Sequence, residues 1–360
     1  MIFVFIFLIL LICAFNELFL KKKLNKKIFW GICIILVILA GFRFNTGYDY
    51  DAYLQMYDIS TKLSNITETN FEIGFSFMMY VFKSIGLPFY VFTLFISFLS
   101  IFSKFYFFDK AFEKYKYTLS FVYFSVFYFT LELAQIRLGL CMGLCLISTI
   151  FLFKKKEILF YITILFAASI HITAFAFLPC YFIIHSKRRM TIMKYLCILS
   201  LVLSIVNLRD LLFFINDYFL KSEFIYIKIV DNFDQLSFIN ISLILKIAVI
   251  LVSFLAFKER NINEKIIKNS QILYLYGIIL YVGFHQIAIL SIRTSSLFRL
   301  FEVPLLCETL SIIRDTGIFK HKKIFIGVIL VLISIYYIYK FYSIFKDPNY
   351  FNYKSIFGNF

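Results

Sequence analysis

A run of polar side chains between Arg43 and Tyr53 could bind a ligand that carries both anionic oxygens and a sugar ring. The planar fork of Arg43 suits phosphate or carboxylate oxygens. Asp49 or Asp51 could accept a proton from an attacking hydroxyl. Tyr50 and Tyr53 offer flat faces and hydroxyls to a sugar. A belt of interfacial tyrosines around a snorkelling arginine is the alternative explanation.

A second polar group, Glu132, Gln135 and Arg137, lies between two apolar stretches. Gln135 and Arg137 could hold an anionic headgroup, and a capped turn with a local ion pair is the alternative. Gly139 and Gly143 follow in the G-x-x-x-G spacing that allows helices to pack closely.

His171 and Arg299 are isolated candidates. His171 lies in an apolar segment, where it could act as a base near neutral pH or as a hydrogen-bonded structural residue. Arg299 precedes Glu302 by three positions, so the two would neutralise each other on one helix.

The sequence predicts no metal site and no cofactor. Its four histidines are scattered, and its seven cysteines lie in apolar segments without a C-x-x-C spacing. The P-loop, G-x-S-x-G and H-E-x-x-H motifs are also absent, which argues against an ATPase, a hydrolase and a zinc protease.

The composition places these residues in or beside a lipid bilayer. Of the 360 residues, 62% are apolar or aromatic and 16% are charged, whereas soluble domains carry about 25% charged residues. The net charge of +16 comes in short basic blocks between apolar runs. This pattern orients a membrane protein and contacts anionic membrane lipid, and it does not indicate nucleic acid. The sequence predicts one all-α, polytopic membrane domain over residues 1–360.

We predict about ten full transmembrane helices plus a re-entrant or broken helix pair. The predicted spans are Ile2–Leu20, Ile28–Phe42, Leu87–Phe108, Tyr117–Glu132, Arg137–Phe153, Thr191–Leu208, Phe238–Phe257, Ile272–Ile292, Leu297–Ile313 and Ile324–Phe345. Ile73–Ile85 is too short to cross and predicts an interfacial or re-entrant helix. Ile158–Ile184 is interrupted by Pro179 and flanked by basic blocks, so we expect two half-helices that dip in and return, with His171 near the apex.

The loop charges predict the orientation. The net basic segments Lys104–Lys116, Lys258–Lys268 and Arg314–Lys323 would be cytoplasmic. The acidic loops 43–72 and 209–237 would be extracytoplasmic, together with an uncleaved N-terminus and the C-terminus. The candidate residues would then gather on the extracytoplasmic face of the cytoplasmic (inner) membrane.

The order of these residues resembles the EpsG family over most of the chain. The resemblance rests on Arg43-x3-Gly47-x-Asp49-Tyr50-x2-Tyr53, Glu72-x-Gly74-Phe75, Gln135-x-Arg137, His171 followed by Ala174, and Arg299-Leu300-Phe301-Glu302. This family consists of multi-pass, Wzy-like polysaccharide polymerases.

The resemblance implies a membrane glycosyltransferase that joins polyprenyl-diphosphate-linked oligosaccharide repeat units into O-antigen, capsule or exopolysaccharide. Substrate would be bound by Arg43, Tyr50, Tyr53, Glu72, Gln135, Arg137 and Arg299. His171 and Asp49 would be catalytic, with His171 slightly favoured as the base. The diphosphate leaving group would supply the energy. Expected partners are membrane lipid, a flippase and a chain-length regulator of the same pathway.

Two alternatives stay open on the sequence alone. One is an O-antigen ligase or another lipid-linked sugar transferase, and the other is a non-enzymatic flippase of the lipid-linked unit. A flippase would place charges along a path through the midplane, whereas the predicted spans are nearly charge-free there apart from Lys246 and His285.

Overall fold

The structure is a computed structural model that describes residues 2–20, 25–67, 71–208, 210, 213, 236–237, 240–259, 265–316 and 335–359. The chain divides into two compact units, Met1–Leu178 with Ile313–Phe360, and Pro179–Ile312. Both units are built from helices, which confirms the all-α class. That the whole chain forms one membrane domain stays a prediction. The predicted outer loop 209–237 lies almost entirely outside the described residues.

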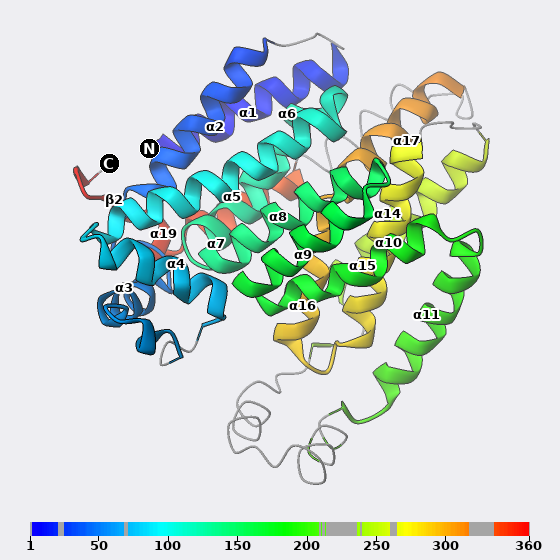
Figure 1. The fold of residues 1–360 in the computed structure, drawn as a ribbon. Helices are drawn as coiled ribbons and strands as arrows, with labels where there is room; N and C mark the ends of the chain where they lie inside the picture. Colours follow the sequence, from blue (N-terminus) through cyan, green and yellow to red (C-terminus); the bar gives the residue numbers. More distant parts are fainter. Residues whose placement is uncertain are drawn as a thin grey trace. The chain divides into compact units, whose positions relative to one another are not determined.

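The first unit is a bundle of apolar helices (Figure 1). They are α1 (Ile2–Phe19), α2 (Lys26–Gly41), α3 (Tyr50–Ile59), α4 (Ile73–Ser84), α5 (Phe89–Ala111), α6 (Lys116–Tyr123), α7 (Phe129–Glu132), α8 (Ile136–Phe153) and α9 (Glu157–Ile170). A π-helical turn joins α6 to α7, so the predicted span Tyr117–Glu132 is one helical path. The helix α5 packs against α2 and α8, while α1 packs against α6 and α8 against α9. The predicted short helix at Ile73–Ile85 is present as α4.

The second unit contains α11 (Arg189–Ile205), α14 (Ile241–Glu259), α15 (Lys265–Gly283), α16 (Ala288–Arg299) and most of α17 (Glu302–Thr316). The prediction of a continuous span over Ile272–Ile292 is wrong, because α15 ends at Gly283. The physical reason lies in Gln286. Its side chain donates to the carbonyls of Ser204 and Val206 at 2.9 and 2.8 Å and accepts from the Leu208 N–H at 3.0 Å. It therefore satisfies polar groups at the end of α11 that would otherwise be orphaned.

Four of the described helices are long and apolar enough to cross a membrane. They are Phe89–Ala111, Ile136–Phe153, Ile241–Lys258 and Lys265–Gly283. This agrees with a multi-pass membrane protein, and the count of ten spans stays a prediction. Where α8 crosses α5, a Cβ on Gly143 would lie 2.9 Å from the Ser100 carbonyl oxygen. The G-x-x-x-G spacing therefore serves close helix packing, as expected.

The two ends of the first unit differ in charge. At one end, Asp109 binds Lys26 at 2.7 Å and Lys116 at 3.1 Å, and Glu17 accepts hydrogen bonds from the start of α6. Because α2 begins at Lys26 and ends at Gly41, Arg43 lies at the opposite end. The basic end is the one predicted to face the cytoplasm.

Residues 347–359, here called the C-terminal clasp, join the Arg43 end of the first unit. Strand β1 (Arg43–Phe44) pairs antiparallel with β2 (Lys354–Ser355), which pairs with β3 (Gly358–Asn359). The Tyr353 hydroxyl donates to the Leu39 carbonyl at 2.7 Å. Figure 1 shows β2 and the short helix α19 (Pro348–Phe351) at the end of the unit that holds α3 and α4. The C-terminal segment thus lies on the same side as loop 43–72, as the topology prediction requires.

Exposed lysines near the two ends of the first unit supply a test of orientation. In a variant whose native cysteines are replaced, single cysteines at Lys62 and Lys354 should react with an impermeant maleimide in right-side-out vesicles. A cysteine at Lys154 should react only after permeabilisation, because it follows the far end of a spanning helix. All three positions are exposed. Equal labelling of Lys154→Cys and Lys62→Cys before permeabilisation would contradict the topology.

The turn after Arg43 supplies a test of the packing. Gly47 has φ +91, and a Cβ there would overlap the Leu133 carbonyl oxygen. Gly47→Ala should therefore destabilise the protein by roughly 1–3 kcal/mol through overpacking and about 1–2 kcal/mol through the left-handed backbone. Thermal unfolding in detergent measures the loss. The matched control is Gly31→Ala in α2, where nothing lies within 4 Å of the new Cβ and stability should hold or rise. Equal melting temperatures for the two variants would refute the close approach at Gly47.

Candidate functional site

Arg43 is the most unusual side chain of the first unit. It is 1% exposed, directly after the end of α2. Its Nη1 donates to the carbonyls of Glu132 at 2.7 Å and Ala40 at 3.3 Å. Its Nε and Nη2 are buried without a hydrogen-bond partner in the described part of the chain. Burial lowers the pKa of Arg43, yet an arginine stays charged. The site therefore holds a full positive charge with two unused donors.

Two tyrosines on α3 lie beside this charge. The Tyr50 ring centroid is 5.9 Å from the Arg43 Cζ. Tyr53, one turn further, is buried, and the charge of Arg137 acts on its hydroxyl. Burial raises the pKa of Tyr53, while Arg137 acts in the opposite direction. Tyr53 therefore stays a neutral phenol that can donate to a sugar oxygen.

Asp49 and Gln135 each precede a helix at this end of the unit. Asp49 is the residue before α3; it is half-buried, its side chain makes no capping bond, and its charge reaches Tyr53. Gln135 is the residue before α8 and is also half-buried. Asp49 directly precedes Tyr50, and Gln135 precedes Arg137 by two residues.

Glu72 joins three helices. One carboxylate oxygen binds Arg137 Nη1 at 2.5 Å, and the other accepts the Ile172 N–H at 3.0 Å. The Arg137 Cζ lies 4.0 Å from the centroid of the Phe71 ring, and its Nε lacks a partner among the described residues. Both charged side chains keep about a fifth of their surface exposed, 24% for Glu72 and 19% for Arg137. Glu72 thus ties the starts of α4 and α8 to the chain after α9.

His171 marks the break in the segment predicted as two half-helices. α9 ends at Ile170, and His171 is extended, with φ −154 and ψ 123. The break therefore falls at His171 and not at Pro179, which lies in the first turn of α10 (Leu178–His185), where a missing N–H is tolerated. The buried ring accepts the Thr173 N–H on Nδ1 at 3.3 Å. His171 therefore caps the helical turn Ile172–Phe177.

Lys104 and Glu132 form an ion pair in the interior of the first unit. Their side chains are 0% and 1% exposed, and Nζ lies 2.9 Å from Oε1. The ammonium also donates to Ser100 Oγ at 2.7 Å and to the Gly139 carbonyl at 2.6 Å. The Tyr123 hydroxyl donates to the Glu132 carboxylate at 2.8 Å.

This pair corrects two expectations. The cytoplasmic segment cannot begin at Lys104, because Lys104 lies inside α5 and points into the bundle. The predicted spans also contain a buried ion pair, in addition to the midspan residues Lys246 and His285. A signal was present in the sequence: a lone lysine and a lone glutamate in apolar runs each cost about 2.5–3.5 kcal/mol in a bilayer. Such residues need each other as partners.

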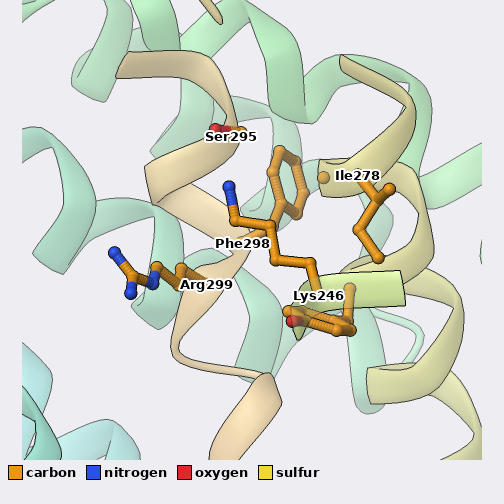
Figure 2. Close-up of a pocket in the computed structure, with 7 residues that line it drawn as sticks. Lys246, Ile278, Ser295, Phe298 and Arg299 are labelled. Atoms are coloured by element: carbon orange, nitrogen blue, oxygen red, sulfur yellow. The ribbon is translucent and has the colours of Figure 1, made fainter. Parts of the chain in front are cut away.

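Arg299 lies in the second unit and lines a pocket there (Figure 2). The lining residues are Lys246 from α14, Tyr274, Gly277 and Ile278 from α15, and Ser295, Phe298 and Arg299 from α16. Arg299 ends α16 and Glu302 begins α17, so the two residues do not lie on one continuous helix as expected. The Glu302 carboxylate accepts the Tyr274 hydroxyl at 2.9 Å. The structure thus brings Arg299 together with Lys246.

The first unit therefore gathers eight of the nine predicted site residues, and the chemistry that they offer is anion recognition and proton transfer. Arg43, Tyr50, Tyr53, Arg137 and Glu72 are connected by the contacts above. Within the described residues, no group of three or more His, Cys, Asp or Glu side chains could hold a metal ion.

Comparison with known proteins gives one family. Neither the curated proteins nor the solved structures contain a match to this chain. Residues 26–355 match the family model of the EpsG family, and this range includes every candidate residue discussed above. Because the match covers nearly the whole sequence, the chain belongs to the EpsG family.

Proposed function

We propose that this protein polymerises polyprenyl-diphosphate-linked oligosaccharide repeat units into a bacterial surface polysaccharide, such as O-antigen, capsule or exopolysaccharide. Membership of the EpsG family implies a polysaccharide polymerase-like role. The observation that carries the proposal is Arg43, a buried cation with two unused donors beside Tyr50. Orphaned buried donors cost about 1–3 kcal/mol each, and the oxygens of a diphosphate would satisfy them.

The reaction is a glycosyl transfer between two lipid-linked chains. A hydroxyl of the acceptor sugar attacks the anomeric carbon of the donor sugar, and the bond from that carbon to the diphosphate breaks. Polyprenyl diphosphate leaves, and the hydroxyl proton passes to a base. Arg43 binds the diphosphate and stabilises its growing charge, with Arg137 as a second cation. Tyr50 and Tyr53 pack against the sugar, and Glu72 and Gln135 orient Arg137 and the substrate.

The contacts of the two base candidates favour Asp49 over His171. His171 Nδ1 lies 3.3 Å from the Thr173 backbone nitrogen and 2.9 Å from the Thr173 hydroxyl. This ring nitrogen is therefore engaged within the cap. The Asp49 carboxylate makes no capping bond and acts on the Tyr53 hydroxyl through its charge. We assign the base to Asp49 and a positioning role to His171.

The active face would be extracytoplasmic, on the cytoplasmic membrane. The basic end of the first unit, with Lys26 and Lys116, is opposite to Arg43, as the positive-inside rule requires for this orientation. Lipid-linked units would then arrive from a flippase, and a chain-length regulator would act on the product. Arg299, in the second unit, would also bind substrate.

The interior ion pair supports an enzyme over a flippase. A flippase needs polar groups that line an open path, whereas Lys104 and Glu132 are closed off by α5 and α8 and bind each other. The ligase alternative differs in its product, because a ligase transfers glycan to a different acceptor lipid.

Arg43→Lys tests diphosphate binding. Lysine keeps the charge but loses the planar fork that can bind two oxygens. The variant should insert and accumulate normally, while the polymer shortens toward single repeat units on a gel of the surface polysaccharide. Arg188→Lys, at an exposed turn near the basic block, is the matched control and should leave chain length unchanged. Long polymer from Arg43→Lys would remove Arg43 from the site. If Arg43→Lys made polymer of normal length but failed to transfer it to an acceptor lipid, the ligase function would be favoured.

Asp49→Asn tests the base. Loss of a general base lowers turnover by about 10²–10⁴-fold, measured with lipid-linked repeat units and purified protein in nanodiscs. Asp58→Asn, an exposed residue of the helix that follows Asp49, should keep turnover. His171→Asn retains an acceptor for the Thr173 N–H and should keep most of the activity. If His171→Asn lost activity to the same extent while Asp49→Asn kept it, the two roles would have to be exchanged.

A further inference from the structure

Arg43 and Lys104 both bind Glu132, but they bind different groups of this residue. Arg43 binds its main-chain carbonyl oxygen at 2.7 Å, and Lys104 binds its carboxylate at 2.9 Å. None of the ion pairs between described residues includes Arg43. Arg43 is therefore held by neutral acceptors alone, although a carboxylate belongs to the residue that it touches.

We propose that Lys104 is a positioning residue that holds the Glu132 carboxylate away from Arg43 and so keeps the Arg43 guanidinium available to substrate phosphate. This inference rests on the proposed function. Opposite charges attract strongly where water is excluded, and a buried carboxylate needs a cationic partner. Without Lys104, Arg43 would be the next cation to Glu132. Rotation of the glutamate side chain could then form an internal ion pair, which would compete with the ligand.

The surroundings of Lys104 are built to keep the ammonium in place. Ser100 Oγ and the Gly139 carbonyl accept from it at 2.7 and 2.6 Å, so it is anchored to both α5 and α8. Tyr123 donates to the carboxylate and holds the other half of the pair. These acceptors satisfy the N–H groups of the buried ammonium and fix its position beside the carboxylate.

The charge of the Glu132 carboxylate already reaches Arg43. Burial lowers the pKa of the Arg43 guanidinium, and the Glu132 carboxylate is among the neighbours that act to raise this pKa again. The two groups therefore attract each other although they form no ion pair.

The test measures binding of farnesyl diphosphate, a short polyprenyl diphosphate, to purified variants in nanodiscs. Lys104→Met should weaken binding by about 10–100-fold, the value of a charge-assisted hydrogen bond. Lys104→Met/Glu132→Gln should restore the affinity to within about threefold, since no carboxylate remains to compete and neither position of the former ion pair carries a charge. The KM for lipid-linked repeat units should follow the same order. Lys83→Met is the matched control. Lys83 in α4 pairs with Asp58 in α3 at 2.7 Å, so this ion pair involves neither Arg43 nor Glu132.

Each outcome separates this inference from the proposed function. If Lys104→Met binds as the wild type does, or if the folded double variant binds as weakly as the single one, the positioning role is overturned. If Lys104→Met does not fold, Glu132→Gln decides: retained affinity supports the inference, and lost affinity overturns it. Loss of binding in Arg43→Lys together with normal binding in Lys104→Met leaves the proposed function standing. Normal binding in Arg43→Lys overturns both.

Discussion

The ion pair between Lys104 and Glu132 is the interaction on which the Arg43 end of the first unit depends. Both side chains are buried. In such a place, apolar residues of similar volume are often as stabilising as an ion pair, so stability alone does not account for it. The pair connects α5 to the end of α7, and through the Gly139 carbonyl it also reaches α8. Its glutamate then supplies the carbonyl that holds Arg43.

From this pair the arrangement of the site follows step by step. Arg43 can be buried beside Tyr50 because its charge is met by carbonyl dipoles and by aromatic rings. Arg137, by contrast, has its own carboxylate in Glu72. The two arginines therefore differ in chemistry: one keeps its charge uncompensated, and the other shares it with an acid that also holds the chain after His171.

Much of the site could be predicted because its signals are local. An arginine and several tyrosines directly after an apolar run, and a histidine within one, stand out in a lipid-facing sequence. The alternation of spans predicts that these residues lie on one side of the membrane. The hydrogen bond between Glu72 and Ile172, which are 100 residues apart, agrees with that prediction.

The predictions that are wrong share a physical cause: in each case the structure depends on a partner that is distant in the sequence. The prediction that a basic loop begins at Lys104 is wrong because Lys104 binds Glu132, which lies in another helix. The break after Gly283 comes from a glutamine that satisfies another helix. The strands of the C-terminal clasp have two residues each, too few for a periodic pattern. Arg299 shares the family pattern but belongs to the other unit.

The C-terminal clasp has a consequence for the biosynthesis of this protein. Lys354 follows Thr46, its hydrogen-bonding neighbour, by 308 residues. At 5–20 residues per second, the ribosome needs about 15–60 s to make the chain between them. During that interval strand β1, which carries Arg43, has no strand to pair with. A nascent chain therefore has to be kept from mispairing at this edge. The Arg43 end of the first unit is completed only after the last residues of the chain have been made, and in the predicted topology only after they have also been translocated.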